Sequence, residues 1–111
     1  MRVAAVMSDL MLFSRIESAA SAANASLIRV DSPSDLSDDL GLVLVDWSSR
    51  RPDWADALAV WHDRSASRLI LFGQHTDLEA HAAARAAGLG PMWARSKLIA
   101  DLQSLLHEGA V

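Results

Sequence analysis

The sequence predicts an α/β protein built on a parallel sheet, and two observations support this prediction. Short apolar runs bounded by polar residues recur along the chain, and their length and composition suit strands buried on both faces. The strongest runs are residues 3–7, 42–45 and 69–72, and the weaker ones are residues 27–30 and 91–94. Most segments between them have helical patterns. This alternation indicates β-α-β units with right-handed crossovers, and hence an open sheet covered by helices on both faces.

The first helix is expected over residues 9–23, with Ser8 as its N-cap and Asn24 placed to end it in a left-handed conformation. Its apolar face consists of side chains at helical spacing, namely Leu12, Ile16, Ala19 and Ala23. Only residues 31–40 separate the second and third strands, and this segment is rich in Ser and Asp and contains Pro33. The second helix is therefore expected to be short or irregular.

The three later helices have start and stop signals. Residues 53–64 carry an apolar stripe at spacings of four and three, formed by Trp54, Leu58 and Trp61. Residues 77–87 form an alanine-rich helix, with Thr76 as its cap and Gly88 at its end. Ser96 is expected to open the last helix. Its leucines can face the sheet, and they are Leu98, Leu102, Leu105 and Leu106.

Composition narrows the classes of function. The chain has 111 residues, so we expect one domain spanning residues 1–111, and the absence of cysteine excludes disulfides, thiolate metal sites and cysteine nucleophiles. Four histidines lie on different elements without metal-ligand spacing. A formal net charge of -4 with scattered cations disfavours nucleic acid as a partner. With no membrane segment or signal peptide in the pattern, we expect no membrane partner and a cytoplasmic location.

Active sites in such sheets lie at the carboxyl ends of the strands. Here these ends carry Ser8-Asp9, Asp31, Asp46-Trp47-Ser48-Ser49, Gly73-Gln74-His75 and Arg95-Ser96-Lys97. At these positions the sequence resembles the receiver domains of two-component response regulators, because Leu42–Asp46 is similar to the receiver third strand that ends in its phospho-acceptor aspartate. Ala86-Ala87-Gly88, followed by a strand ending at Arg95, is similar to the family's glycine turn and fifth strand. The resemblance implies a flavodoxin-like, three-layer α/β/α fold with strand order 2-1-3-4-5.

Receiver chemistry needs two acidic residues for magnesium after the first strand, a hydroxyl residue after the fourth and a lysine after the fifth. Met7 and Ser8 stand where the acidic pair is expected, and Asp9 supplies one carboxylate a residue late. Gly73 replaces the hydroxyl residue and Arg95 replaces the lysine. A thioether is a poor magnesium ligand, and the planar fork of arginine differs in shape and reach from an ammonium group.

We therefore expect Asp46 to be a structural carboxylate paired with Arg95. On this interpretation the chain is a stand-alone pseudo-receiver in signalling or regulation, acts through protein contact, and has no enzyme activity and no cofactor. The first alternative is a divergent active receiver, phosphorylated at Asp46 with help from Asp9 and Arg95 and with magnesium bound. The second is a small ligand-binding or enzymatic flavodoxin-like module whose pocket contains His75, Asp46 and Arg95.

Three side chains are candidates for partner contact. Trp47 follows Asp46, where a receiver loop is usually partly exposed. Met92 stands where the family commonly has its aromatic switch residue, and it alternates with Trp93 on the last strand, so one of the two is expected to point toward the last two helices. Receivers often associate through that face. A homodimer through the last strand and last two helices is therefore a candidate arrangement.

Overall fold

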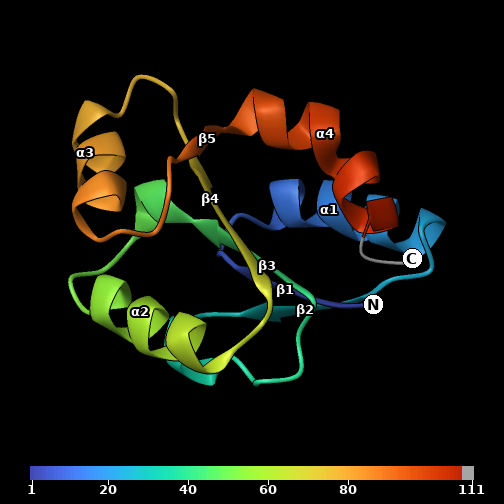
Figure 1. The fold of residues 1–111 in the computed structure, drawn as a ribbon. Helices are drawn as coiled ribbons and strands as arrows, with labels where there is room; N and C mark the ends of the chain where they lie inside the picture. Colours follow the sequence, from blue (N-terminus) through green and yellow to red (C-terminus); the bar gives the residue numbers. More distant parts are fainter. Residues whose placement is uncertain (109–111) are drawn as a thin grey trace.

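A computed structural model describes residues 1–108 and confirms the parallel α/β fold. Five strands form one parallel sheet in the order β2-β1-β3-β4-β5, which is a flavodoxin-like arrangement (Figure 1). Their bounds are β1 Arg2–Val6, β2 Ser26–Val30, β3 Leu42–Asp46, β4 Arg68–Gly73 and β5 Trp93–Ala94. The helices within the described residues are α1 Leu10–Ala22, α2 Trp54–Arg64, α3 Leu78–Ala86 and α4 Arg95–Glu108, with 3-10 helices η1 Pro33–Asp35 and η2 Trp47–Ser49.

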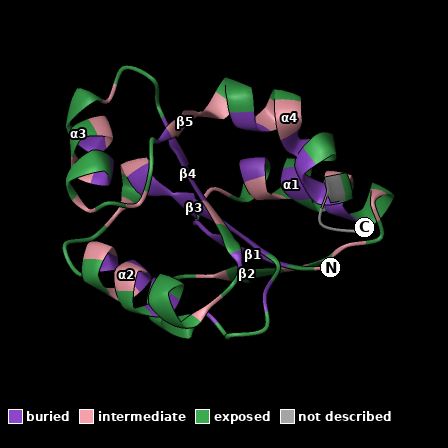
Figure 2. Cartoon of the chain, viewed as in Figure 1, coloured by how far each residue is buried: buried purple, intermediate pink, exposed green. Residues whose placement is uncertain are grey.

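The helices cover the two faces of the sheet in pairs. Helices α1 and α4 lie together on one face, and α2 and α3 lie on the other (Figure 1). Successive residues of β1 and β3 point to opposite faces, so each strand contributes to both cores. The α1/α4 core includes Ala5 and Leu44, and the α2/α3 core includes Val6 and Val45. Burial is deepest along these central strands, while the outer faces of the helices are exposed (Figure 2).

The apolar faces expected of the helices are confirmed. Leu12 and Ile16 of α1 are buried, and Ala19 and Ala23 are partly buried against the same core. The stripe of α2 and the leucines of α4 are also buried, namely Trp54, Leu58, Trp61, Leu98, Leu102, Leu105 and Leu106. The segment between β2 and β3 forms only the three-residue η1, as the sequence predicts.

Two predicted caps are wrong by one residue. Asp9, not Ser8, caps α1, and its Oδ1 accepts hydrogen bonds from the amides of Met11 and Leu12 at 3.1 Å each. Asp77, not Thr76, caps α3. In each case two neighbouring residues both have capping side chains, and the later one aligns its oxygen with the first-turn amides.

Helix ends follow the sequence more closely. Asn24, which follows α1, has a φ of 56°, and Gly88, which follows α3, has a φ of 69°. Both therefore adopt the predicted left-handed conformation. Helix α4 begins at Arg95, one residue earlier than expected, and follows β5 with no intervening loop residue. This direct junction fixes the Arg95 backbone at the carboxyl end of the sheet.

Candidate functional site

Asp46 is the last residue of β3 and lies at the carboxyl end of the sheet, with 1% of its surface exposed. Ser49 Oγ donates a hydrogen bond to Asp46 Oδ2 at 3.0 Å. The second oxygen, Oδ1, is buried and has no hydrogen-bond partner among the described residues. Both oxygens are thus withdrawn from solvent, one of them held by the chain itself.

The guanidinium of Arg95 lies between two carboxylates. Its Nη2 is 3.6 Å from Asp46 Oδ2, and its Nη1 is 3.7 Å from Asp9 Oδ2. These distances define ion pairs rather than hydrogen bonds. The predicted pairing of Asp46 with Arg95 is confirmed, and Asp9 joins the same group. We call these three residues the Arg95 centre.

Asp9 has two structural roles. Its Oδ1 caps α1, while its Oδ2 faces Arg95. The cap fixes the carboxylate at the start of the helix, and the helix N-terminus favours a negative charge there. Asp9 is therefore held in the Arg95 centre by the fold of the β1–α1 loop.

Gly73, at the end of β4, leaves space that Ser48 fills. A Cβ atom at position 73 would clash with Ser48 Oγ and lie 2.8 Å from Met92 Sδ. Ser48 Oγ also accepts a hydrogen bond from the Gln74 amide at 3.1 Å. Ser48, which follows the neighbouring strand β3, thus places a hydroxyl group beside Gly73, where the chain has no hydroxyl side chain of its own.

The sequence identifies Ser48 only as one of the residues that follow the third strand. The parallel register of β3 and β4, which sets Asp46 beside Phe72, brings position 48 close to position 73. A glycine at the end of one strand and a small polar residue after its neighbour were the available signal.

Ser8 lies outside the Arg95 centre. Its side chain is exposed and makes no hydrogen bond with any described residue. Met7 is buried, and its carbonyl accepts a hydrogen bond from Arg29 Nη1 at 3.1 Å. Neither position therefore supplies an acidic ligand beside Asp46, in keeping with the sequence.

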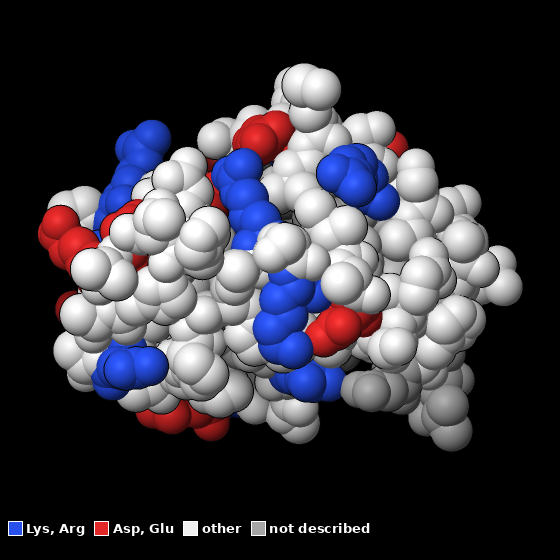
Figure 3. Space-filling view, turned by 90° about the horizontal axis from the view of Figure 1, so that it is seen from above, with Lys and Arg blue, Asp and Glu red and all other residues white. Residues whose placement is uncertain are grey.

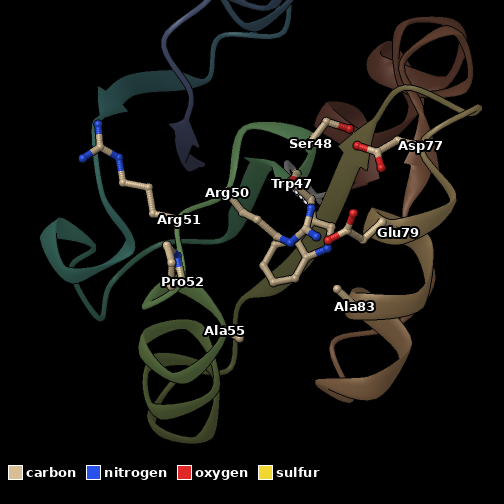
Figure 4. A pocket seen from close by; sticks show the side chains of 9 residues that line it. All are labelled: Trp47, Ser48, Arg50, Arg51, Pro52, Ala55, Asp77, Glu79 and Ala83. Carbon is tan, nitrogen blue, oxygen red and sulfur yellow. Dashed lines mark hydrogen bonds between the residues drawn. The ribbon is translucent and has the colours of Figure 1, made fainter.

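Trp47 is not exposed as the resemblance suggested. It is 1% exposed, and its Nε1 donates to the Ala80 carbonyl at 2.9 Å, which joins the end of β3 to α3. Arg50 lies across its ring, with Cζ 5.3 Å from the centroid (Figure 4). The indole fits between the β3 end and α3 because small alanines line that helix, so it offers no area to a partner here.

Met92 and Trp93 point to opposite faces of the sheet. Met92 is buried in the α2/α3 core, whereas Trp93 is partly buried against the α1/α4 core. Lys97 Nζ lies 4.4 Å from the Trp93 ring centroid. Of the three candidate contact residues, only Trp93 keeps a partly exposed surface.

His75 and Arg95 share a separate cleft of about 420 Å³ at the ends of β4 and β5. Asp46 does not line it. His75 is exposed, and its carbonyl lies 3.1 Å from His81 Nε2. Among residues 1–108, no group of three or more His, Asp or Glu side chains is arranged to hold a metal ion.

Two comparisons of the chain with known proteins find no match. No protein-family model matches the sequence, and no curated protein matches it either.

No helix in the described part of the chain is long and apolar enough to cross a membrane. On the face shown in Figure 3, basic and acidic side chains are interspersed, so this face carries no large patch of one charge sign.

Proposed function

We propose that this chain is a receiver-like domain that acts through protein contact in signalling or regulation, without magnesium-dependent aspartyl phosphorylation. The observation that carries the proposal is the position of Arg95 between Asp9 and Asp46. The guanidinium already supplies a positive charge between the two carboxylates. A metal ion would have to displace it and then find further oxygen ligands.

The burial of Asp46 supports the same proposal. Only 2% of its side chain is exposed, and a phosphoryl donor must reach one carboxylate oxygen in line. Ser49 holds Oδ2, and Oδ1 is sealed from solvent. Phosphorylation would therefore require both Arg95 and the loop after β3 to move.

Acetyl phosphate and beryllofluoride, each with magnesium, test this proposal. Trp47 follows Asp46 directly, so its fluorescence and amide NMR signal report on any change at the carboxylate. We expect neither reagent to change these signals or the mass of the protein. An Arg95→Ala variant is the matched control, because removing the guanidinium should raise the affinity of Asp9 and Asp46 for magnesium. A response of the native chain that is lost in Asp46→Asn would establish the divergent active receiver instead.

The protein-contact part of the proposal concerns β5, α3 and α4. Strand β5 is an edge of the sheet, and Trp93 on it is partly exposed. Leu78 at the start of α3 is 76% exposed. These side chains make the last strand and last two helices the proposed surface for a homodimer.

Light scattering tests the homodimer. We expect twice the chain mass of 12.0 kDa for the native protein and the monomer mass for Leu78→Glu. Val60→Glu is the matched control, since Val60 is 57% exposed but lies on α2. A native protein that remains monomeric at high micromolar concentration contradicts this arrangement.

A further inference from the structure

A second cleft lies where the chain order of the sheet reverses. Strands β1 and β3 are neighbours, and β2 lies on the far side of β1, so their carboxyl ends form the topological switch point. Ligands of open α/β sheets bind outside the strand ends at such points. A cleft of about 290 Å³ occupies this place, and we call it the switch-point cleft. It is lined by Met7, Ser8, Asp31, Ser49, Arg51 and Trp54.

The cleft contains hydrogen-bond donors that have no acceptor among residues 1–108. The Ser8 hydroxyl and the Arg51 guanidinium have no partner among the described residues. The Trp54 indole is also unpartnered, although the residue is only 4% exposed. Its Nε1 is not among the sealed polar atoms of residues 1–108, so the small exposed part of Trp54 includes this nitrogen.

The other two buried tryptophans behave differently. The Nε1 atoms of Trp47 and Trp61 both donate to backbone carbonyls at 2.9 Å. Buried indole N–H groups usually find such a partner. Trp54 alone of the three lacks one within the described chain, and it is the one that lines the switch-point cleft.

Arg50 and Arg51 both line a second cleft, of about 540 Å³, next to α3, and Arg51 also lines the switch-point cleft. Arg50 lies over Trp47, and its Nη1 donates to the Trp47 carbonyl at 3.2 Å. Arg51 extends the opposite way, away from Trp47 and Glu79 (Figure 4). Arg50 is thus held against Trp47, while the Arg51 guanidinium points away from Trp47 and has no partner among the described residues.

The amino-terminal end of α2 forms part of the wall of the switch-point cleft. Trp54 is the first residue of the eleven-residue helix, and the N-cap Asp53 makes no side-chain hydrogen bond to its first-turn amides. The first-turn amides of α2 therefore lie at the wall of the cleft that Trp54 provides, where the carboxylates of Asp53 and Asp56 offset the positive end of the helix dipole.

We propose that the switch-point cleft binds a small organic anion through one carboxylate or phosphate group. Arg51 supplies the charge, and Ser8 and Trp54 Nε1 donate hydrogen bonds to the anionic oxygens. Asp31 at the rim pairs with Arg29 at 2.7 Å and is left able to accept from a hydroxyl or amino group of the ligand. The volume is near the lower end of the roughly 300–1,000 Å³ found for ligand pockets, which favours a small hydroxy acid or sugar phosphate over a dinucleotide.

This inference does not rest on the proposed receiver-like function. The anion site uses none of the residues of the Arg95 centre. Ser49 borders both, because it lines the cleft and donates to Asp46 Oδ2. If the Ser49 hydroxyl donates to a bound anion, its hydrogen bond to Asp46 Oδ2 is weakened. Binding in the cleft is therefore expected to change the surroundings of Asp46.

NMR titration of the ¹⁵N-labelled protein tests the proposal. The probes are inorganic phosphate, glycerol 3-phosphate, acetate and glycolate, each added to millimolar concentration. Trp54→Phe assigns the Trp54 indole signal by its disappearance. We expect a saturable shift of this signal together with the Ser8 and Arg51 amides. Shifts from the two phosphates alone, or from the two carboxylates alone, identify the anionic group that is recognised.

Variants separate a built site from general charge attraction. Arg51→Gln should weaken binding about tenfold or more, and Ser8→Ala should weaken it severalfold. Arg50→Gln is the matched control and should bind as the native protein does. The proposal is overturned if no probe gives a saturable shift at Trp54, or if Arg51→Gln binds as tightly as Arg50→Gln. The spectrum of each variant reports at once whether it is folded.

Discussion

The Arg95 centre and the switch-point cleft lie at the same carboxyl edge of the sheet but differ in how their polar groups are satisfied. In the Arg95 centre the chain supplies both signs of charge, with Arg95 between Asp9 and Asp46. In the switch-point cleft, the Arg51 guanidinium and the Trp54 indole have N–H donors for which no described residue provides an acceptor. A resemblance to a family directs attention to the first region, whereas the unused donors favour the second as the place for a ligand.

The same comparison separates a charge that stabilises the fold, on Arg95, from a charge that is available to a ligand, on Arg51. A buried carboxylate is costly without a nearby cation, so Arg95 has a structural reason to be where it is. Arg51 is exposed and contributes no ion pair within residues 1–108. Removing each arginine should therefore have opposite consequences for stability and for binding.

Removal of Arg95 should have the largest effect on stability. Arg95→Met leaves the buried Asp46 without a counter-charge, which costs roughly 3–5 kcal/mol for a fully buried pair. Because 37% of the Arg95 side chain is exposed, water compensates in part, and we expect a loss of about 2 kcal/mol. Urea denaturation measures the free energy of unfolding.

The matched control for this prediction is the double variant with Asp46→Asn, which should recover most of the loss because no buried charge remains. A destabilisation by Arg95→Met that is no smaller in the Asp46→Asn background would show that the two residues are not coupled.

Gly73→Ala should destabilise by about 1.5 kcal/mol. The added methyl group meets Ser48 Oγ and Met92 Sδ, and overpacking of this kind costs roughly 1–3 kcal/mol. Met92 is flexible and can move, but Ser48 would give up its hydrogen bond from Gln74. Thermal denaturation of Gly73→Ala alone and combined with Ser48→Gly measures the effect. If Ser48→Gly does not reduce the cost, the hydroxyl is not what fills the space at Gly73.

Two substitutions at Asp9 separate its capping role from its ion pair. Asp9→Ala removes both and should cost about 1 kcal/mol, the usual value for an N-cap. Asp9→Asn keeps a good cap without the charge, and should stay within about 0.5 kcal/mol of the native protein because the pair with Arg95 is partly exposed. Equal losses for the two variants, measured by urea denaturation, would assign the effect to the charge.

The sequence predicts the fold and the pairing of Asp46 with Arg95 for clear physical reasons. Strands buried on both faces leave continuous apolar runs, and β1 and β3 are such runs. Strand ends of a parallel sheet converge on one edge, which predicted that Asp46 and Arg95 would meet. The caps at Asp9 and Asp77 were missed because capping depends on side-chain direction within a loop, which neighbouring Ser or Thr residues can equally satisfy.

Features that depend on contacts between distant elements were not predictable. The burial of Trp47 requires α3 to place the Ala80 carbonyl within reach of its indole. The switch-point cleft requires Arg50 and Arg51 to diverge, and the sequence shows only two adjacent arginines. Such features follow from the packing of helices on the sheet, on which local patterns carry no information.

The smallest expected effect on stability is that of Arg51→Gln. The side chain is exposed and unpaired within residues 1–108, so its removal should change the free energy of unfolding by less than about 0.5 kcal/mol. Urea denaturation without added anion measures this value, and repetition with phosphate or glycolate should stabilise the native protein more than the variant, since the variant binds the anion about tenfold more weakly. A large loss without ligand would mean that Arg51 supports the fold, and the contrast with Arg95 would then be wrong.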